Sequence, residues 1–130
     1  MAVMVAPVIP FVNDHEIEDI VAAGTAAGAA TMRYILLRLP HEVKDLFRAW
    51  LDVHYPLKAE RVMSAIKSAR GGKAYDARWG TRMRGEGSMA ELIGVRFRAA
   101  LKRHHILDAQ SPELRTDLFR PPGQRQLSLI

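Results

Sequence analysis

The sequence of 130 residues has no cysteine and only 7% aromatic residues. Without thiols the chain can hold no disulfide, cysteine nucleophile, thiolate zinc site or cysteine-ligated iron–sulfur cluster of its own. No stretch approaches the ~18 apolar residues of a membrane-spanning helix. The apolar start, residues 1–12, is not preceded by a basic segment. We therefore expect a cytoplasmic protein with no membrane partner.

Hydrophobic residues make up 48% of the chain, enough for a packed core in one domain or part of one. The formal charge of +5 is unevenly distributed. Residues 61–105 carry 11 basic and 3 acidic side chains, whereas residues 1–60 carry 5 basic and 8 acidic ones. The second half thus has the charge to face a polyanion, although such stretches are more often solvated surfaces.

The first 40 residues alternate between strand and helix patterns. Residues 1–9 lack polar side chains, which predicts a strand covered on both faces. Asn13 and Glu16 match a capping box at the start of a helix that ends near Gly28. A second covered strand is predicted over 34–39, closed by Pro40. This order indicates a right-handed parallel crossover unit.

Helical periodicity dominates from residue 43 onward. The first predicted helix spans 43–55, with these side chains inward: Val43, Leu46, Phe47, Trp50, Leu51 and Tyr55. A second spans 58–70, with an inward face of Val62, Met63 and Ile66. Residues 71–87 contain five glycines and predict a loop. Ser88 and Glu91 match a capping box for a helix over 88–105, with the apolar face Met89, Leu92, Ile93, Phe97, Ala100 and Leu101.

We divide the chain into three parts on these patterns. Residues 1–57 form the strand–helix units, residues 58–105 form a basic helical extension around the 71–87 loop, and residues 106–130 form an extended or mobile tail.

In parallel sheets, ligands bind beyond the carboxyl ends of the strands. Arg38, near the end of an apolar strand, must reach a ligand, a carboxylate or solvent. His15 and His41 follow the two strands and are candidate general bases, although helix-end positions without a nucleophile favour a structural role. The adjacent pair His104 and His105 points to different helix faces, so we predict no metal site.

The glycine-rich loop interleaves aromatic and basic residues. Such a segment can stack bases and hold phosphates. Alternatively, its aromatic side chains fill the core while its arginines pair with the acidic first half, and the pattern favours this alternative slightly. The nucleic-acid or anion candidates are Lys73, Tyr75, Arg78, Trp79, Arg82 and Arg84.

Several longer segments carry a family resemblance. They are VAPVIP (5–10), NDHEI (13–17), YILLRLP (34–40), EVK (42–44) and YDARWGTRMRG (75–85). Together they resemble the C-terminal part of bacterial radical SAM proteins, in an uncharacterised subgroup grouped with spore photoproduct lyase. The likeness runs from residue 1 to about residue 103 and continues weakly into 118–123 and 126–129.

The resemblance implies an α/β fold: the C-terminal fragment of a partial TIM-like (βα)6 radical SAM barrel, with two parallel strands followed by a mainly helical extension. Family members bind S-adenosylmethionine at a four-iron four-sulfur cluster held by a CxxxCxxC loop. That loop is absent here, so the chain is not expected to be competent alone. The resemblance implies these contacts to cofactor or substrate: Pro7, Pro10, Asn13, Arg38 and Pro40.

The expected partner is the missing N-terminal half of the barrel, encoded by the same gene or a split gene, or else a second copy of the chain. We expect Met1 to fall inside the family's fifth strand, as in a truncated reading frame or an expressed fragment. Two hypotheses compete with this one. The chain is a basic helical module that binds nucleic acid through residues 73–84, or it is an interaction subunit that docks on another protein.

Overall fold

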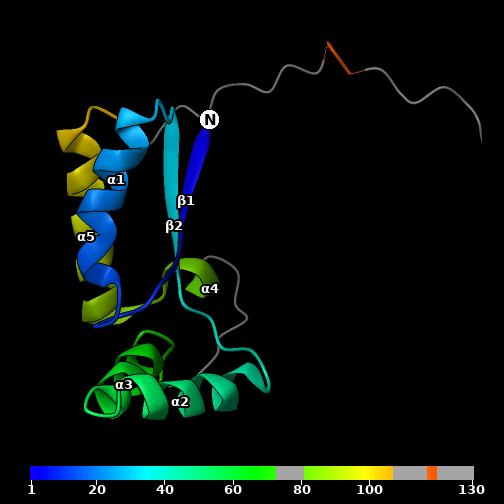
Figure 1. Ribbon diagram of the computed structural model, residues 1–130, viewed down its shortest axis with the longest axis vertical. Coiled ribbons are helices and arrows are strands. Elements are labelled where there is room, and N and C mark those ends of the chain that lie inside the picture. The colour runs from blue at the N-terminus through cyan, green and yellow to red at the C-terminus, as the bar shows by residue number, and fades with distance from the viewer. Residues whose placement is uncertain (73–80, 107–116, 120–130) are drawn as a thin grey trace, which may run out of the picture.

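The computed structural model describes residues 1–72, 81–106 and 117–119. The elements are, in order, β1 (Ala2–Val8), a 3-10 turn η1 (Asp14–Glu16), α1 (Ile17–Ala26), β2 (Thr31–Leu36), α2 (Val43–His54), α3 (Ala59–Ser68), α4 (Thr81–Arg84) and α5 (Gly87–Arg103) (Figure 1). The strands β1 and β2 are parallel and α1 connects them. The chain is therefore a mixed α/β structure, as predicted.

The second strand begins three residues earlier than predicted and ends at Leu36. Ala2 pairs with Thr31 and Val5 with Tyr34, and an irregularity then brings Val8 opposite Leu36. The predicted bounds of 34–39 are therefore wrong at both ends, although residues 34–36 do lie in the strand. Arg33 is exposed, and a charged side chain on the solvent face of a strand is compatible with regular pairing.

Along most of the length of the strands the described helices cover only one face of the sheet, which corrects the prediction of two covered faces, and α4 contacts β2 only at its carboxyl end. Figure 1 shows α1 and α5 on the same side of the strands. Side chains on that side are buried, among them Val5, Met32 and Leu36. On the other side Ala2 and Ala6 are exposed and Met4 is 54% exposed. An uninterrupted apolar run thus occurs in a strand with one open face.

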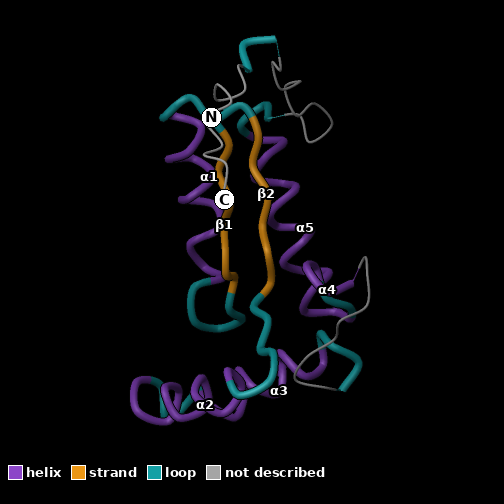
Figure 2. Tube along the Cα trace, turned by 90° about the vertical axis from the view of Figure 1, so that its right-hand side faces the viewer, coloured by secondary structure: helices purple, strands orange, loops and turns teal. Residues whose placement is uncertain are grey.

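A second core lies at the carboxyl ends of the strands, where α2 and α3 cross below the sheet (Figures 1 and 2). Its buried residues are Leu39, Leu51, Ala59, Val62, Met63 and Ile66. The inward face predicted for α3 is confirmed, but that of α2 is partly wrong. Leu46 is 68% exposed and Trp50 is 39% exposed, because α2 contacts its neighbours along the narrower strip that contains Leu51 and Phe47.

The helix α5 covers the sheet beside α1. Ile93, Phe97, Ala100 and Leu101 are buried as predicted, but Leu92 is 51% exposed. The capping box predicted at Ser88 is also wrong, because α5 begins at Gly87 and no side chain caps it. Part of the predicted loop 71–87 is helical, since α4 occupies residues 81–84.

A buried arginine closes the carboxyl end of β2. Arg70 is only 2% exposed, and its Nη2 donates hydrogen bonds to the carbonyl oxygens of Leu36 and Leu37 at 3.2 and 3.1 Å. Gly85 lies nearby with a φ of +75°. A Cβ at Gly85 would come within 2.8 Å of Leu36 Cδ2 and 2.9 Å of the Ala69 carbonyl oxygen. Only glycine fits at position 85 without displacing these neighbours.

Two alanine substitutions distinguish strain from steric conflict. Gly85 and Gly28 both have positive φ, but a Cβ at Gly28 would meet no atom within 4 Å. We expect Gly28→Ala to cost about 1 kcal/mol from left-handed strain alone. Gly85→Ala should cost about 1–3 kcal/mol more because of overpacking. Urea denaturation followed by circular dichroism measures both, and equal losses would contradict the close approach at Gly85.

Candidate functional site

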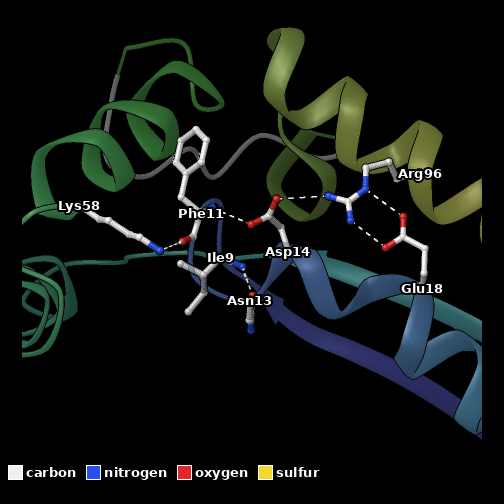
Figure 3. A network of polar contacts seen from close by, with 7 residues as sticks. All are labelled: Ile9, Phe11, Asn13, Asp14, Glu18, Lys58 and Arg96. Carbon is white, nitrogen blue, oxygen red and sulfur yellow. Dashed lines mark hydrogen bonds and ion pairs between the residues drawn. The ribbon is translucent and has the colours of Figure 1, made fainter.

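The turn after β1 is held by the side chain of Asn13. Its Oδ1 accepts a hydrogen bond from the Ile9 backbone N–H at 2.7 Å (Figure 3). Its Nδ2 donates to the Pro7 carbonyl oxygen at 3.0 Å. Pro10, between them, is fully buried. Asn13 therefore fastens the end of β1, and the capping box predicted with Glu16 does not form, since no side chain caps η1 or α1.

The tip of this turn is at Phe11, which has a φ of +63°. The Phe11 N–H donates to Asp14 Oδ1 at 2.7 Å, and its carbonyl oxygen accepts a hydrogen bond from Lys58 Nζ at 3.3 Å (Figure 3). The Arg61 guanidinium lies 4.1 Å from the centre of the Phe11 ring, within cation–π range. Residues from α3 and its N-terminal flank thus hold a strained turn at the carboxyl end of the sheet.

An ion-pair cluster connects the same turn to α5. Arg96 donates two hydrogen bonds to the Glu18 carboxylate at 2.9 and 2.7 Å and one to Asp14 Oδ2 at 3.3 Å (Figure 3). The hydrogen bond from Arg96 lowers the pKa of Glu18, against a smaller opposing effect of burial. The same bond raises the pKa of Arg96. Both side chains are half-buried, so the pair contributes more than a fully exposed one.

Of the five residues that the family resemblance implied as contacts, Pro7, Pro10 and Asn13 lie together at the end of β1. Arg38 and Pro40 follow β2 at the same end of the sheet. Arg38 is half-buried, with its Nη1 3.9 Å from the Met83 sulfur. The two segments therefore meet where ligands of parallel sheets bind, although the core between α2 and α3 also occupies this end.

The other candidate residues are less informative. His15 and His41 are exposed, and His15 lies 3.9 Å from the neighbouring Glu16. Their assignment as general bases stays a prediction. Residues 73–80 of the basic loop lie outside the described part of the chain, and they include four of the candidates: Lys73, Tyr75, Arg78 and Trp79. The side chain of Arg82 is not described either, whereas Arg84 is exposed at the end of α4.

Sequence reasoning missed Arg96 and its two carboxylates. The signal that could have found them is the four-residue spacing of Asp14 and Glu18, which places both on one side of a helix start. Nothing local indicated which of the 11 basic residues in 61–105 would reach them. The partner is separated from Glu18 by 78 positions, so only the tertiary fold identifies it.

Within residues 1–72, 81–106 and 117–119, no three His, Asp or Glu side chains gather in a way that could hold a metal ion. No helix in the same residues is both long and apolar enough to cross a membrane. In the turn after β1, the side chains of Asn13 and Asp14 form hydrogen bonds with the chain's own backbone. These bonds position the carboxyl end of β1.

The described fold is a parallel strand–helix–strand unit with α5 on its covered face and a pair of helices at its carboxyl end. Compared with protein-family models, with curated proteins and with solved structures, the chain matches none of them.

Substitutions at Asn13 separate its two hydrogen bonds. Asn13→Asp keeps the acceptor for the Ile9 N–H but loses the donor to the Pro7 carbonyl, whereas Asn13→Ala loses both. At about 0.5–1.5 kcal/mol for each bond, we expect Asn13→Ala to cost roughly twice as much as Asn13→Asp. Urea denaturation at pH 7 measures the two losses. Equal losses would mean that only the bond to Pro7 stabilises the turn.

The Glu18–Arg96 pair predicts a specific pH dependence. Because the folded-state pKa of Glu18 is lowered, the pair stabilises the protein above pH 4.5, the ordinary pKa of the group. That contribution disappears as the pH falls through the lowered value. Glu18→Gln should therefore cost about 1 kcal/mol at pH 7 and flatten the loss of stability on acidification.

The neighbouring Asp19, an exposed carboxylate on α1, provides the matched control. Asp19→Asn should leave the acid-dependent loss of stability close to that of the unsubstituted protein. The measurement is the free energy of unfolding in urea at a series of pH values from 7 down to 3. If the free energy of unfolding falls as steeply with decreasing pH in Glu18→Gln as in Asp19→Asn, the Glu18–Arg96 pair is not the source of the pH dependence.

Proposed function

We propose that this chain is the C-terminal part of a radical SAM enzyme, contributing the last two strand–helix units of a partial barrel and a helical extension. The sequence resemblance over residues 1–103 suggested the family. The observation that carries the proposal is the one-sided sheet, with α1 and α5 on one face and Ala2, Met4 and Ala6 exposed on the other. In a barrel of alternating strands and helices, the helices form the outer layer and the opposite face of the sheet lines the interior.

The edges of the sheet support the same proposal. In the described part of the chain the sheet contains only β1 and β2, so each strand has one edge without a neighbouring strand. A two-stranded sheet is marginal by itself, and an open edge is a template for a further strand. A partner that carries the preceding strands would pair along β1 and cover Met4. The proposed partner is therefore the N-terminal half of the barrel.

The residues of this chain do not fit the iron–sulfur cluster of that family, because the chain has no cysteine. They also offer little hydrogen bonding to S-adenosylmethionine, since both polar groups of the Asn13 amide are bound to the turn and Pro10 is buried. We propose that Pro7, Pro10 and Asn13 shape the rim of the pocket, and that Arg38 and Pro40 form the adjacent segment. The reacting groups would come from the partner.

The first test is the DNA that precedes the Met1 codon. The proposal expects a CxxxCxxC-encoding sequence upstream, in frame or in an adjacent reading frame. The cysteine-bearing polypeptide and this chain would then be co-expressed and purified without oxygen. We expect a one-to-one complex with cluster absorbance and no cluster on this chain alone. The absence of any such coding sequence nearby, or a cluster spectrum from this chain alone, would contradict the proposal.

A matched pair of substitutions tests where the partner docks. Met4→Lys puts a charge on the open face of the sheet, whereas Ala23→Lys puts the same charge on the exposed side of α1. Because an unpaired charge is costly to bury, Met4→Lys should weaken the complex at least about tenfold. Ala23→Lys should change its affinity less than about twofold. Equal effects in a binding titration would place the contact elsewhere.

A further inference from the structure

A surface pocket of about 330 Å³ lies beside β2, next to α4 and α5. Figure 2 shows both helices on the β2 side of the sheet. The pocket is lined by residues that the carboxyl-end site does not use. Those that matter here are Tyr34, Arg84, Gly85, Glu91, Gly94 and Arg98.

Two polar groups converge at the floor of this pocket, over Gly94. A Cβ built on Gly94 would lie 3.0 Å from the Tyr34 hydroxyl oxygen and 3.3 Å from Arg98 Nη1. The two side chains therefore approach a common point beside Gly94, where any larger residue would crowd the Tyr34 hydroxyl. The Tyr34 ring packs on Phe97 with the ring centres 4.9 Å apart, which fixes the direction of its hydroxyl.

The pocket has an excess of positive charge. Arg84 and Arg98 bring two guanidinium groups, and Glu91 brings one carboxylate. Within the described residues neither arginine forms an ion pair, whereas Arg96, two positions before Arg98 on α5, is fully engaged with Glu18 and Asp14. Residues two positions apart on a helix point in different directions. One arginine of this helix thus holds the fold together and the other faces the pocket.

We propose that this pocket binds a small phosphomonoester. The phosphate would lie between Arg84 and Arg98, because guanidinium groups donate paired hydrogen bonds to phosphate oxygens. The Tyr34 hydroxyl would donate a third bond, and the Glu91 carboxylate would accept one from a hydroxyl of the organic part. The volume is at the lower end of the range for small-molecule sites.

This site is independent of the proposed function. It is beside the face of β2 that α5 covers, whereas the partner of the proposed barrel would dock on the opposite face. The phosphomonoester site would therefore survive if no cysteine-bearing partner exists. The converse also holds, since a failed ligand test would leave the docking proposal unchanged.

The test is isothermal titration calorimetry of the full chain at low ionic strength with ribose 5-phosphate, inorganic phosphate and a single-stranded oligonucleotide. We expect ribose 5-phosphate to bind saturably at one site and inorganic phosphate to compete more weakly. Arg98→Gln should weaken ribose 5-phosphate at least about tenfold, because it removes charge-assisted hydrogen bonds. Tyr34→Phe, which loses only the hydroxyl, should weaken it severalfold.

Lys102→Gln is the matched control, since it removes one positive charge from the exposed surface of the same helix without touching the pocket. Its affinity for ribose 5-phosphate should stay within about twofold of the unsubstituted chain. The proposal is overturned if ribose 5-phosphate gives no saturable binding, or if Lys102→Gln and Arg98→Gln weaken it equally. Binding of the oligonucleotide alone would also overturn it and would favour a nucleic-acid surface.

Discussion

The rest of the structure depends on the parallel pairing of β1 and β2. A parallel pair cannot be closed by a tight turn, so α1 must cross over one face to connect β1 to β2. The crossover leaves room on the same face for one further helix, and α5 occupies it. On the opposite face the apolar side chain of Met4 is exposed, as are Ala2 and Ala6 of the same strand. This imbalance is the physical basis of the proposed docking partner.

Two arginines connect distant parts of the chain to this sheet. Arg96 reaches the turn after β1 by pairing with Asp14 and Glu18, and Arg70 binds the carbonyl groups at the end of β2. Both come from the segment that composition alone identified as a basic extension. Because buried or half-buried cations need partners, each arginine restricts how the later helices can pack. Part of the basic excess therefore stabilises the fold.

The order of the elements could be predicted because each has a local pattern: an apolar run for β1, a periodic face for α3, and Gly28 after α1. Which faces of these elements are buried could not be predicted in the same way. A run such as Ala2–Val8 looks identical whether a sheet has one covered face or two, and Leu46 and Leu92 fit a helical period without being buried. Burial is decided by neighbours that are distant in the sequence, as is the pairing of Arg96 with Glu18.

Successive side chains of β2 point to opposite faces of the sheet, so the proposed docking surface and the proposed ligand pocket lie on different sides of this strand. Arg33 and Ile35 are on the open face, whereas Tyr34 points to the side of α5 and packs on Phe97. A partner covering the open face would not contact the Tyr34 hydroxyl, and a ligand over Gly94 would not reach Met4. In the described part of the chain, the element that both sites would contact is β2, with Arg33 and Ile35 on the open face and Tyr34 on the other. Any coupling between them would then have to pass through β2, whose carboxyl end is already held by Arg70.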